Sequence, residues 1–172
     1  MTKPRKPGKS RTVARLAAVQ AAYEMEVAGA PADPVLRAFV TQRWNLVETA
    51  KAVEEEEGER PDLQEPDSGL MTSLVRAMVD RRDDLDAMIN GALAEGWTTE
   101  RLELLLLIIL RAGACEMLTE PQVPAKVIIS EYVDIARSFF SEGEPKMVNG
   151  VLDRLARTLR PGDLAPREAP AG

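Results

Sequence analysis

The sequence of 172 residues contains no histidine and a single cysteine, Cys115. Histidine is the commonest general base and the commonest transition-metal ligand, so its absence removes most of the usual catalytic arrangements. One cysteine excludes an internal disulfide, and without a histidine to activate it we expect a buried, unreactive thiol. No glycine-rich phosphate loop of either standard spacing is present. We therefore expect a binding protein and no enzyme, with no catalytic residue, metal site or cofactor.

Long apolar runs and aromatic side chains are also scarce. The longest apolar run covers residues 104–110, whereas a membrane-spanning helix needs about 20 residues. No apolar segment follows the basic N-terminus, so we expect no signal peptide and a cytoplasmic location without membrane contact. Aromatic residues make up 4% of the chain and charged residues 29%. This balance is typical of a soluble helical protein.

The charge is distributed unevenly along the chain. Among 22 basic and 28 acidic residues, six basic residues and no acidic ones precede Glu24. An acidic protein with a pI near 4.9 is an unusual nucleic-acid binder. A basic arm changes that expectation, because phosphate contacts are local and the Debye length is only about 8 Å at physiological salt.

Apolar residues recur at helical spacing through most of the chain, and no strand pattern is found. The first helix is expected over residues 10–28, with Leu16, Val19, Tyr23 and Val27 on one apolar face. A second apolar face comprises Leu36, Phe39, Val40 and Val47. Thr98 or Thr99 is expected to cap the helix that contains the apolar run. The sequence predicts an all-α fold with about seven helices.

The pair Asn149-Gly150 would ordinarily mark a hairpin turn. Its apolar flanks recur at helical spacing instead, at Val148, Val151 and Leu152. We therefore place the pair inside the last helix, with Pro145 as its first residue. A glycine there costs roughly 1 kcal/mol relative to alanine, and we interpret Gly150 as a point where a neighbouring helix approaches the backbone closely.

Composition separates one domain from two tails. Residues 1–9 are rich in proline, glycine and lysine, and residues 161–172 in proline and glycine, so both are expected to be disordered around a domain at 10–160. Within the domain, residues 54–69 include eight acidic residues. They lack the alternating ligands of an EF-hand and are interpreted as a solvated acidic loop.

Three stretches share their pattern with one protein family. They are "ARLAAVQAAY" (14–23), "LRAGACEML" (110–118) and "VPAKVIISEYVDIARSFFSEGEPKMVNGVLD" (123–153). Together they resemble the NusB family of bacterial transcription antitermination factors. The third stretch is the most specific, with its Val-Pro-x-Lys-Val opening and its Lys-x-Val-Asn-Gly-Val-Leu-Asp end. The resemblance spans residues 10–160 and implies two small helical bundles packed together.

The resemblance also implies a function and partners. Members of the family bind boxA, a short single-stranded RNA element, jointly with NusE, a small-subunit ribosomal protein. That complex joins RNA polymerase and other Nus factors and lets the polymerase read through terminators, chiefly during ribosomal RNA transcription. On this basis we expect the NusE-binding face within the helices of residues 98–140.

The family's RNA contacts carry over onto particular residues. Its basic N-terminal contact corresponds to Arg11 and Arg15, and an aromatic near the RNA corresponds to Tyr23, for which a core position is an equal alternative. Lys146 matches a lysine at the start of the last helix, where free N–H groups and the helix dipole also favour phosphate. Its alternative is an ordinary surface lysine. Asn149 is expected either to meet RNA or to satisfy backbone groups near the helix start.

The chain departs from the family pattern at two places. Met147 stands where many relatives have an aromatic residue, so base stacking of about 1–3 kcal/mol is absent there and RNA binding without NusE is expected to be weak. In "LELLLLIILRAG" (102–113) leucines replace polar residues. We expect most of this helix to be core, with one leucine row covered by a partner or by a second copy of the chain.

Two alternatives to an antitermination factor stay open. A NusB-like domain also occurs in ribosomal RNA cytosine methyltransferases, but those need a further cofactor-binding domain. The sequence from Met1 to Gly172 has none, and we expect a free-standing protein. The second alternative is a protein–protein adaptor without RNA binding of its own. About four phosphate contacts on single-stranded RNA predict a log–log salt slope near −3, whereas an adaptor binds no RNA saturably.

Overall fold

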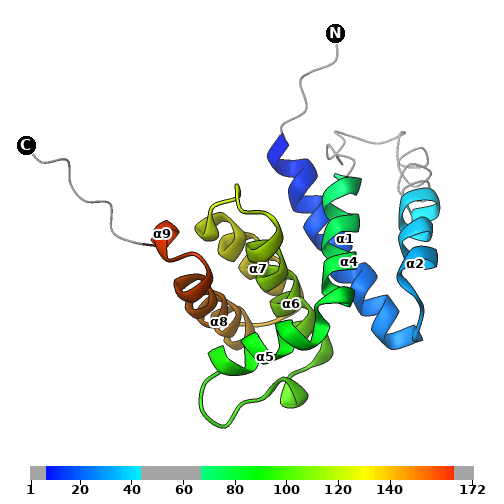
Figure 1. Cartoon of the computed structure of the whole chain (residues 1–172). Helices are drawn as coiled ribbons and strands as arrows, with labels where there is room; N and C mark the ends of the chain where they lie inside the picture. The colour runs from blue at the N-terminus through cyan, green and yellow to red at the C-terminus, as the bar shows by residue number, and fades with distance from the viewer. Residues whose placement is uncertain (1–6, 44–66, 165–172) are drawn as a thin grey trace, which may run out of the picture. The chain divides into compact units, whose positions relative to one another are not determined.

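The computed structural model describes residues 7–43 and 67–164, and within these ranges it contains α-helices, short 3-10 and π-helical turns and connections, but no β-strand (Figure 1). The chain divides into two compact units, Met1–Val79 and Asp80–Gly172. The predicted all-α fold is confirmed, and the division into two helical units agrees with the predicted pair of bundles.

The first unit is formed by α1 (Pro7–Ala28), α2 (Ala32–Ala38), the π-helical turn η1 (Phe39–Arg43) and α4 (Ser68–Asp80). Helix α1 begins three residues before the predicted start, so the end of the predicted N-terminal tail is helical. Its first residue, Pro7, has no N–H to leave unpaired and a backbone φ already suited to a helix, which favours that position.

The buried face of α1 differs from the predicted apolar face. Tyr23 is 40% exposed and Val27 63% exposed. The buried side chains are mostly small: Ala14, Ala17, Ala18, Val19 and Ala21. These positions also recur at helical spacing, but they lie on a different side of the helix axis from Tyr23 and Val27. The small alanine side chains let neighbouring elements pack closely against that side. The periodicity was therefore interpreted correctly as a helix. Of the predicted face, Val19 is buried and Leu16 half-buried, whereas the placement of Tyr23 and Val27 in the core was wrong.

The second predicted helix is divided. Helix α2 passes into η1 at Phe39, which is buried, whereas Val40, predicted on the same apolar face, is 42% exposed. The wider π-helical turn rotates successive side chains differently from an α-helix, so a pattern with a period of 3.6 residues places Val40 incorrectly. Val47 lies outside the described residues.

Helix α4 begins inside the predicted acidic loop. The Asp67 side chain accepts a hydrogen bond from the Leu70 N–H at 3.0 Å, which is the standard N-cap interaction. The backbone N–H of Asp67 donates to the Ser10 carbonyl at 3.1 Å and so links the starts of α4 and α1. Of the predicted loop, residues 54–66 lie outside the described residues.

The second unit contains α5 (Arg82–Ala92), the 3-10 turn η3 (Thr99–Arg101), α6 (Leu104–Thr119), α7 (Ala125–Phe139), α8 (Gly143–Leu159) and α9 (Pro161–Leu164). Helices α6, α7 and α8 pack against one another, and α5 packs against α6 and α8 (Figure 1). Glu103, and neither predicted threonine, occupies the N-cap position of α6. Thr99 instead donates its N–H to Asn90 at 2.8 Å, so both threonines belong to η3 and its start.

The close approach of helices occurs at Gly113 and not at Gly150. A Cβ placed on Gly113 of α6 would lie 2.8 and 2.9 Å from the two Cδ atoms of Leu152 on α8. Among the described residues, a Cβ on Gly150 would meet nothing within 4 Å. The interpretation of Gly150 as a packing glycine was therefore wrong, because this glycine points away from the helices that α8 packs against.

Helix α6 is apolar all round and is buried from Leu106 to Met117. Leu104 and Leu105 are half-buried, so no leucine of the predicted partner-covered row is exposed. Cys115 is buried as predicted. Desolvation in this core raises the pKa of its thiol to about 12, which makes a nucleophilic role at neutral pH impractical.

Two polar residues inside the α6 segment have partners within the same unit. Arg111 binds Asp86 of α5 through two hydrogen bonds of 2.6 and 2.8 Å. The Tyr132 hydroxyl of α7 donates to the fully buried Glu116 carboxylate at 2.7 Å. Buried polar groups are tolerated when hydrogen-bonded, and these bonds connect α6 to α5 and to α7.

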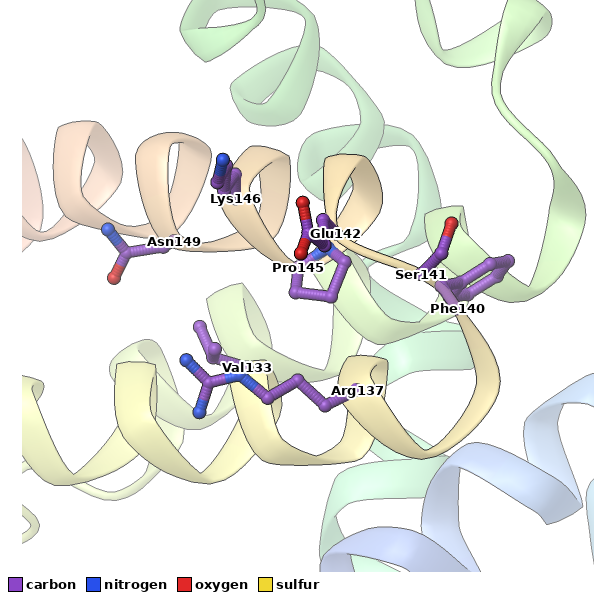
Figure 2. A pocket seen from close by; sticks show the side chains of 8 residues that line it. All are labelled: Val133, Arg137, Phe140, Ser141, Glu142, Pro145, Lys146 and Asn149. Carbon is purple, nitrogen blue, oxygen red and sulfur yellow. The ribbon is translucent and has the colours of Figure 1, made fainter.

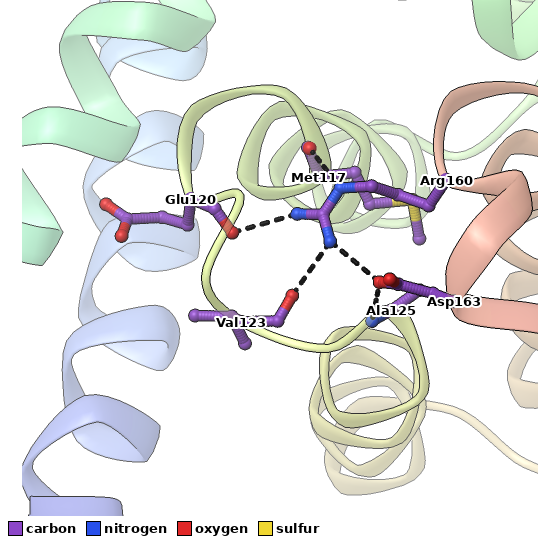
Figure 3. A network of polar contacts seen from close by, with 6 residues as sticks. All are labelled: Met117, Glu120, Val123, Ala125, Arg160 and Asp163. Atoms are coloured by element: carbon purple, nitrogen blue, oxygen red, sulfur yellow. Dashed lines mark hydrogen bonds and ion pairs between the residues drawn. The ribbon is translucent and has the colours of Figure 1, made fainter.

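Arg160, at the end of α8, connects the C-terminal residues to the α6–α7 connection (Figure 3). Its guanidinium donates to the carbonyls of Met117, Glu120 and Val123 at 2.8–3.0 Å. It also pairs with Asp163 of α9 at 2.8 Å. The predicted disordered tail therefore starts with a short ordered helix, because Asp163 is held by this guanidinium.

Candidate functional site

The site lies between α7 and α8, which form a helical hairpin. Phe140, Ser141 and Glu142 alone separate the two helices. Phe140 ends α7 in an extended conformation while its N–H still donates to Ala136. Helix α8 then begins at Gly143, and Pro145 is its third residue, not its first as predicted. A proline is tolerated throughout this first turn, where N–H groups lack helical partners.

A cavity of about 670 Å³ opens at this hairpin (Figure 2). The side chains that line it include Val133, Arg137, Phe140, Pro145, Lys146 and Asn149. Its volume lies within the roughly 300–1,000 Å³ of ordinary ligand sites. Figure 2 shows residues of α7 on one side and residues of α8 on the other, so the hairpin itself forms the site.

Two cationic side chains and one amide provide its binding chemistry. Among the described residues, Lys146 and Asn149 have no side-chain hydrogen-bond or ion-pair partner. Arg137 pairs with Asp134 at 3.1 Å, but both side chains are about two-thirds exposed. Exposed pairs of this kind contribute about 0–1 kcal/mol, so a phosphate can replace the carboxylate at little cost. Glu142 is the one acidic residue among the lining side chains.

The arrangement is suited to a flexible polyanion that also carries planar polar groups. Lys146 and the N-terminal end of α8 both favour a phosphate, and Arg137 can bind one through two nitrogens. Phe140 offers a ring, and Asn149 offers both a donor and an acceptor. Side chains that can bind a phosphate, stack on a base and contact a base edge therefore lie within one hairpin, as single-stranded nucleic-acid sites require.

The structure brings together only part of the predicted RNA site. Lys146 and Asn149 line the same cavity, whereas Met147 is half-buried on α8 and does not line it. The other predicted contacts belong to α1 of the first unit. Arg11 is half-buried and Arg15 only 2% exposed, while Tyr23 is on the surface and not in the core.

Arg137 and Phe140 were missed by the sequence analysis. A signal for them was present in the sequence, because apolar residues at helical spacing from Ile129 to Phe140 stop a few residues before those of the last helix begin. Such a short connection folds the helices back on each other, so the last turn of one meets the first turn of the next. Arg137 stands in that last turn and Lys146 in that first turn.

Other kinds of site find no support in the described parts of the chain. Residues 7–43 and 67–164 contain no group of three acidic or cysteine side chains placed to hold a metal ion. No helix in these ranges is long and apolar enough to cross a membrane.

Comparisons with known proteins agree with this architecture. The model of the NusB family matches residues 12–157. The transcription antitermination protein NusB of Maricaulis maris is 40% identical, with 89% of each chain covered, and that of Brucella anthropi is 45% identical over 87% of this chain and 83% of its own. The solved structure of T. maritima NusB is 25% identical, with a TM-score of 0.64, and 91% of this chain and 93% of that chain are covered. None of these relatives is named for a chemical reaction, in agreement with the predicted lack of enzymatic activity. The chain belongs to the NusB family.

Proposed function

We propose that this protein is a transcription antitermination factor that binds boxA-type single-stranded RNA together with NusE. The complex would join RNA polymerase and other Nus factors in the cytoplasm, mainly on ribosomal RNA transcripts. Membership of the NusB family supports this proposal, because the relatives above are named for transcription antitermination. The observation that carries the RNA-binding step is the cavity between α7 and α8, with its unpaired Lys146 and Asn149.

Within this proposal the cavity binds one nucleotide step of the RNA. Lys146 and Arg137 neutralise a phosphate, and Asn149 contacts a base edge. Met147, half-buried beside Lys146, provides apolar contact without a ring. Stacking of about 1–3 kcal/mol is therefore absent at that position, which makes joint binding with NusE important for affinity.

Arg11, Arg15 and Tyr23 are proposed as further RNA contacts on α1. Their exposures suggest unequal contributions. Tyr23 is 40% exposed and is available for stacking, whereas Arg15 is only 2% exposed and must leave its present surroundings to reach a phosphate. We expect Arg15→Ala to weaken RNA binding less than Lys146→Ala does.

The NusE-binding face is proposed within residues 98–140. In that range the large apolar side chains that are exposed are Val127 and Phe139, at 43% and 44%. Contiguous exposed apolar patches rimmed by polar residues mark protein interaction surfaces, and in this range Val127 and Phe139 are the side chains on which such a patch would be built. Replacing Val127 by serine is expected to weaken NusE binding while leaving binding of RNA alone unchanged.

The test is fluorescence anisotropy of a labelled boxA-type RNA and a scrambled RNA, titrated with the full chain in the presence and absence of NusE. We expect tighter binding of the boxA-type RNA when NusE is present. About four phosphate contacts predict a log–log salt slope near −3, and Lys146→Ala should reduce its magnitude by about 0.7. Arg37→Ala is the matched control, because Arg37 is an exposed cation on α2, outside both the cavity and residues 98–140.

Three results would contradict the proposal. No saturable binding of either RNA while NusE still binds would identify a protein adaptor without RNA binding of its own. Equal binding of both RNAs would contradict recognition of the boxA sequence. An unchanged affinity after Lys146→Ala and Arg137→Ala would place the RNA elsewhere. A methyltransferase is not favoured, because the relatives above are matched over 89% and 83% of their own length and leave little room for a catalytic domain.

A further inference from the structure

A second cavity of about 340 Å³ adjoins the first. The two share Val133, Arg137 and Asn149, and Figure 2 shows these three side chains along the gap between α7 and α8. The second cavity continues to Lys126, near the start of α7, and to Leu164 of α9. Because the shared residues belong to both, one extended ligand can occupy the two cavities in sequence.

The charges of the second cavity differ from those of the first. It is lined by two cations, Lys126 and Arg137, and by two carboxylates, Asp134 and Asp153. Opposite charges in equal number do not favour a phosphate, which needs a net positive site. They favour a neutral group that offers donors and acceptors together, since such a group can bond with every side chain present.

Asp153 is the carboxylate best placed to select such a group. Its side chain is 38% exposed, compared with 66% for Asp134. The Arg157 Nε–H donates to its Oδ2 at 3.0 Å, so the carboxylate is oriented while its acceptor capacity is only partly used. The Asn149 amide, which has no partner among the described residues, lies on the same α8 surface one helical turn earlier.

We propose that the second cavity is a base-specificity pocket for a nucleotide with an exocyclic amino group, next to the nucleotide whose phosphate binds Lys146. Asp153 accepts a hydrogen bond from the amino group, as carboxylates do from cytosine N4. Asn149 bonds another position on the edge of the same base, and Ile129 with Leu164 forms the apolar walls. This pocket rests on the proposed RNA-binding function and adds selectivity to it.

The experiment compares fluorescein-labelled oligocytidylate and oligouridylate of equal length, titrated with the full chain together with NusE at constant salt. The two RNAs have equal charge, and their bases differ in the amino or oxo group at C4. We expect the wild-type chain to bind oligocytidylate about fivefold or more tightly than oligouridylate. Fivefold is about the smallest discrimination that a good base-edge contact provides. Asp153→Ala should abolish this preference and leave the affinity for oligouridylate nearly unchanged.

Arg157→Ala is the matched control. Both substitutions remove the same exposed ion pair and introduce the same helix-favouring residue, but Arg157→Ala keeps the carboxylate. Because this variant keeps the Asp153 acceptor but loses the bond that orients it, the cytosine preference should be reduced in Arg157→Ala and not abolished. Far-UV circular dichroism of both variants establishes that they are folded.

The outcomes separate the pocket from the function on which it rests. If neither RNA binds under any condition, the RNA-binding proposal itself fails. If both RNAs bind and Asp153→Ala leaves their affinity ratio unchanged, the base pocket is wrong while RNA binding stands. If Asp153→Ala instead weakens the binding of NusE and leaves the ratio of the two RNA affinities unchanged, the cavity accepts a side chain of NusE and the base assignment is overturned.

Discussion

Replacing Arg160 by alanine should destabilise the second unit more than an ordinary surface substitution does. The side chain is only 11% exposed, and its guanidinium joins the end of α6, the α6–α7 connection and α9 (Figure 3). Carbonyls in the last turn of a helix have no helical partner, and Met117 is one of them. Arg160 satisfies this carbonyl together with those of Glu120 and Val123.

The magnitude follows from these three hydrogen bonds and the ion pair with Asp163. A hydrogen bond to a charged group contributes about 1.5–3 kcal/mol in mutational series, so simple addition over the three hydrogen bonds alone would give about 5–9 kcal/mol. Interactions that share one side chain are not additive, and water can reach the carbonyls of the half-buried connection. We expect Arg160→Ala to reduce the free energy of unfolding by about 2–4 kcal/mol.

The assay is urea unfolding followed by far-UV circular dichroism. Arg160→Lys serves as the control, because it keeps the positive charge near Asp163 but cannot reproduce the planar fork of donors. We expect it to lower the free energy of unfolding by about half as much as Arg160→Ala does. A loss below about 1 kcal/mol in Arg160→Ala would show that water replaces the guanidinium at all three carbonyls. The reasoning about the connection would then be refuted.

Three further predictions concern α6 and α8. Gly150→Ala should raise the free energy of unfolding by about 0.5–1 kcal/mol in urea titrations, because the new methyl group meets open space in mid-helix. Gly113→Ala should lower the free energy of unfolding by about 1–2 kcal/mol, since the buried Leu152 must move. A change in the same direction for both substitutions would contradict the packing described. With the pKa of Cys115 raised from 9.0 to about 12, the unfolded thiol ionises first as pH rises. Stability should therefore fall between pH 9 and 12, by up to about 1.4 kcal/mol per pH unit, and more steeply than in Cys115→Ala.

The helices of the second unit were predictable because their pattern is local. Apolar residues spaced by three and four around Asn149-Gly150 outweigh the turn preference of that pair, and α8 runs through it. The place of Lys146 near a helix start was predictable for the same reason, whereas its role as an RNA contact is what the resemblance implies and stays a prediction. Asn149 was named as well, but only the α7–α8 hairpin shows that both side chains line one cavity.

The misplaced packing glycine and the misplaced residues on the buried face of α1 depend on contacts distant in sequence. A glycine inside a helix shows that a side chain is missing there, but not whether another helix fills the space. A Cβ placed on Gly113 would meet Leu152, whereas a Cβ placed on Gly150 would meet nothing within 4 Å among the described residues, its own helix backbone aside. The buried face of α1 was likewise chosen for its larger apolar residues, whereas packing selected its alanines.

The sequence by itself determined the helical class, the NusB resemblance and the positions of Lys146 and Asn149 near the start of the last helix. These features follow from periodicity and motif, which need only near neighbours in the chain. Tertiary structure alone decided that Arg137 and Phe140 share a cavity with them, that Arg160 binds three carbonyls around the α6–α7 connection, and that Asp153 lines a second cavity. The physical reason is that hydrogen bonds and packing act over a few ångströms in space, and only the folded chain brings these residues within that distance.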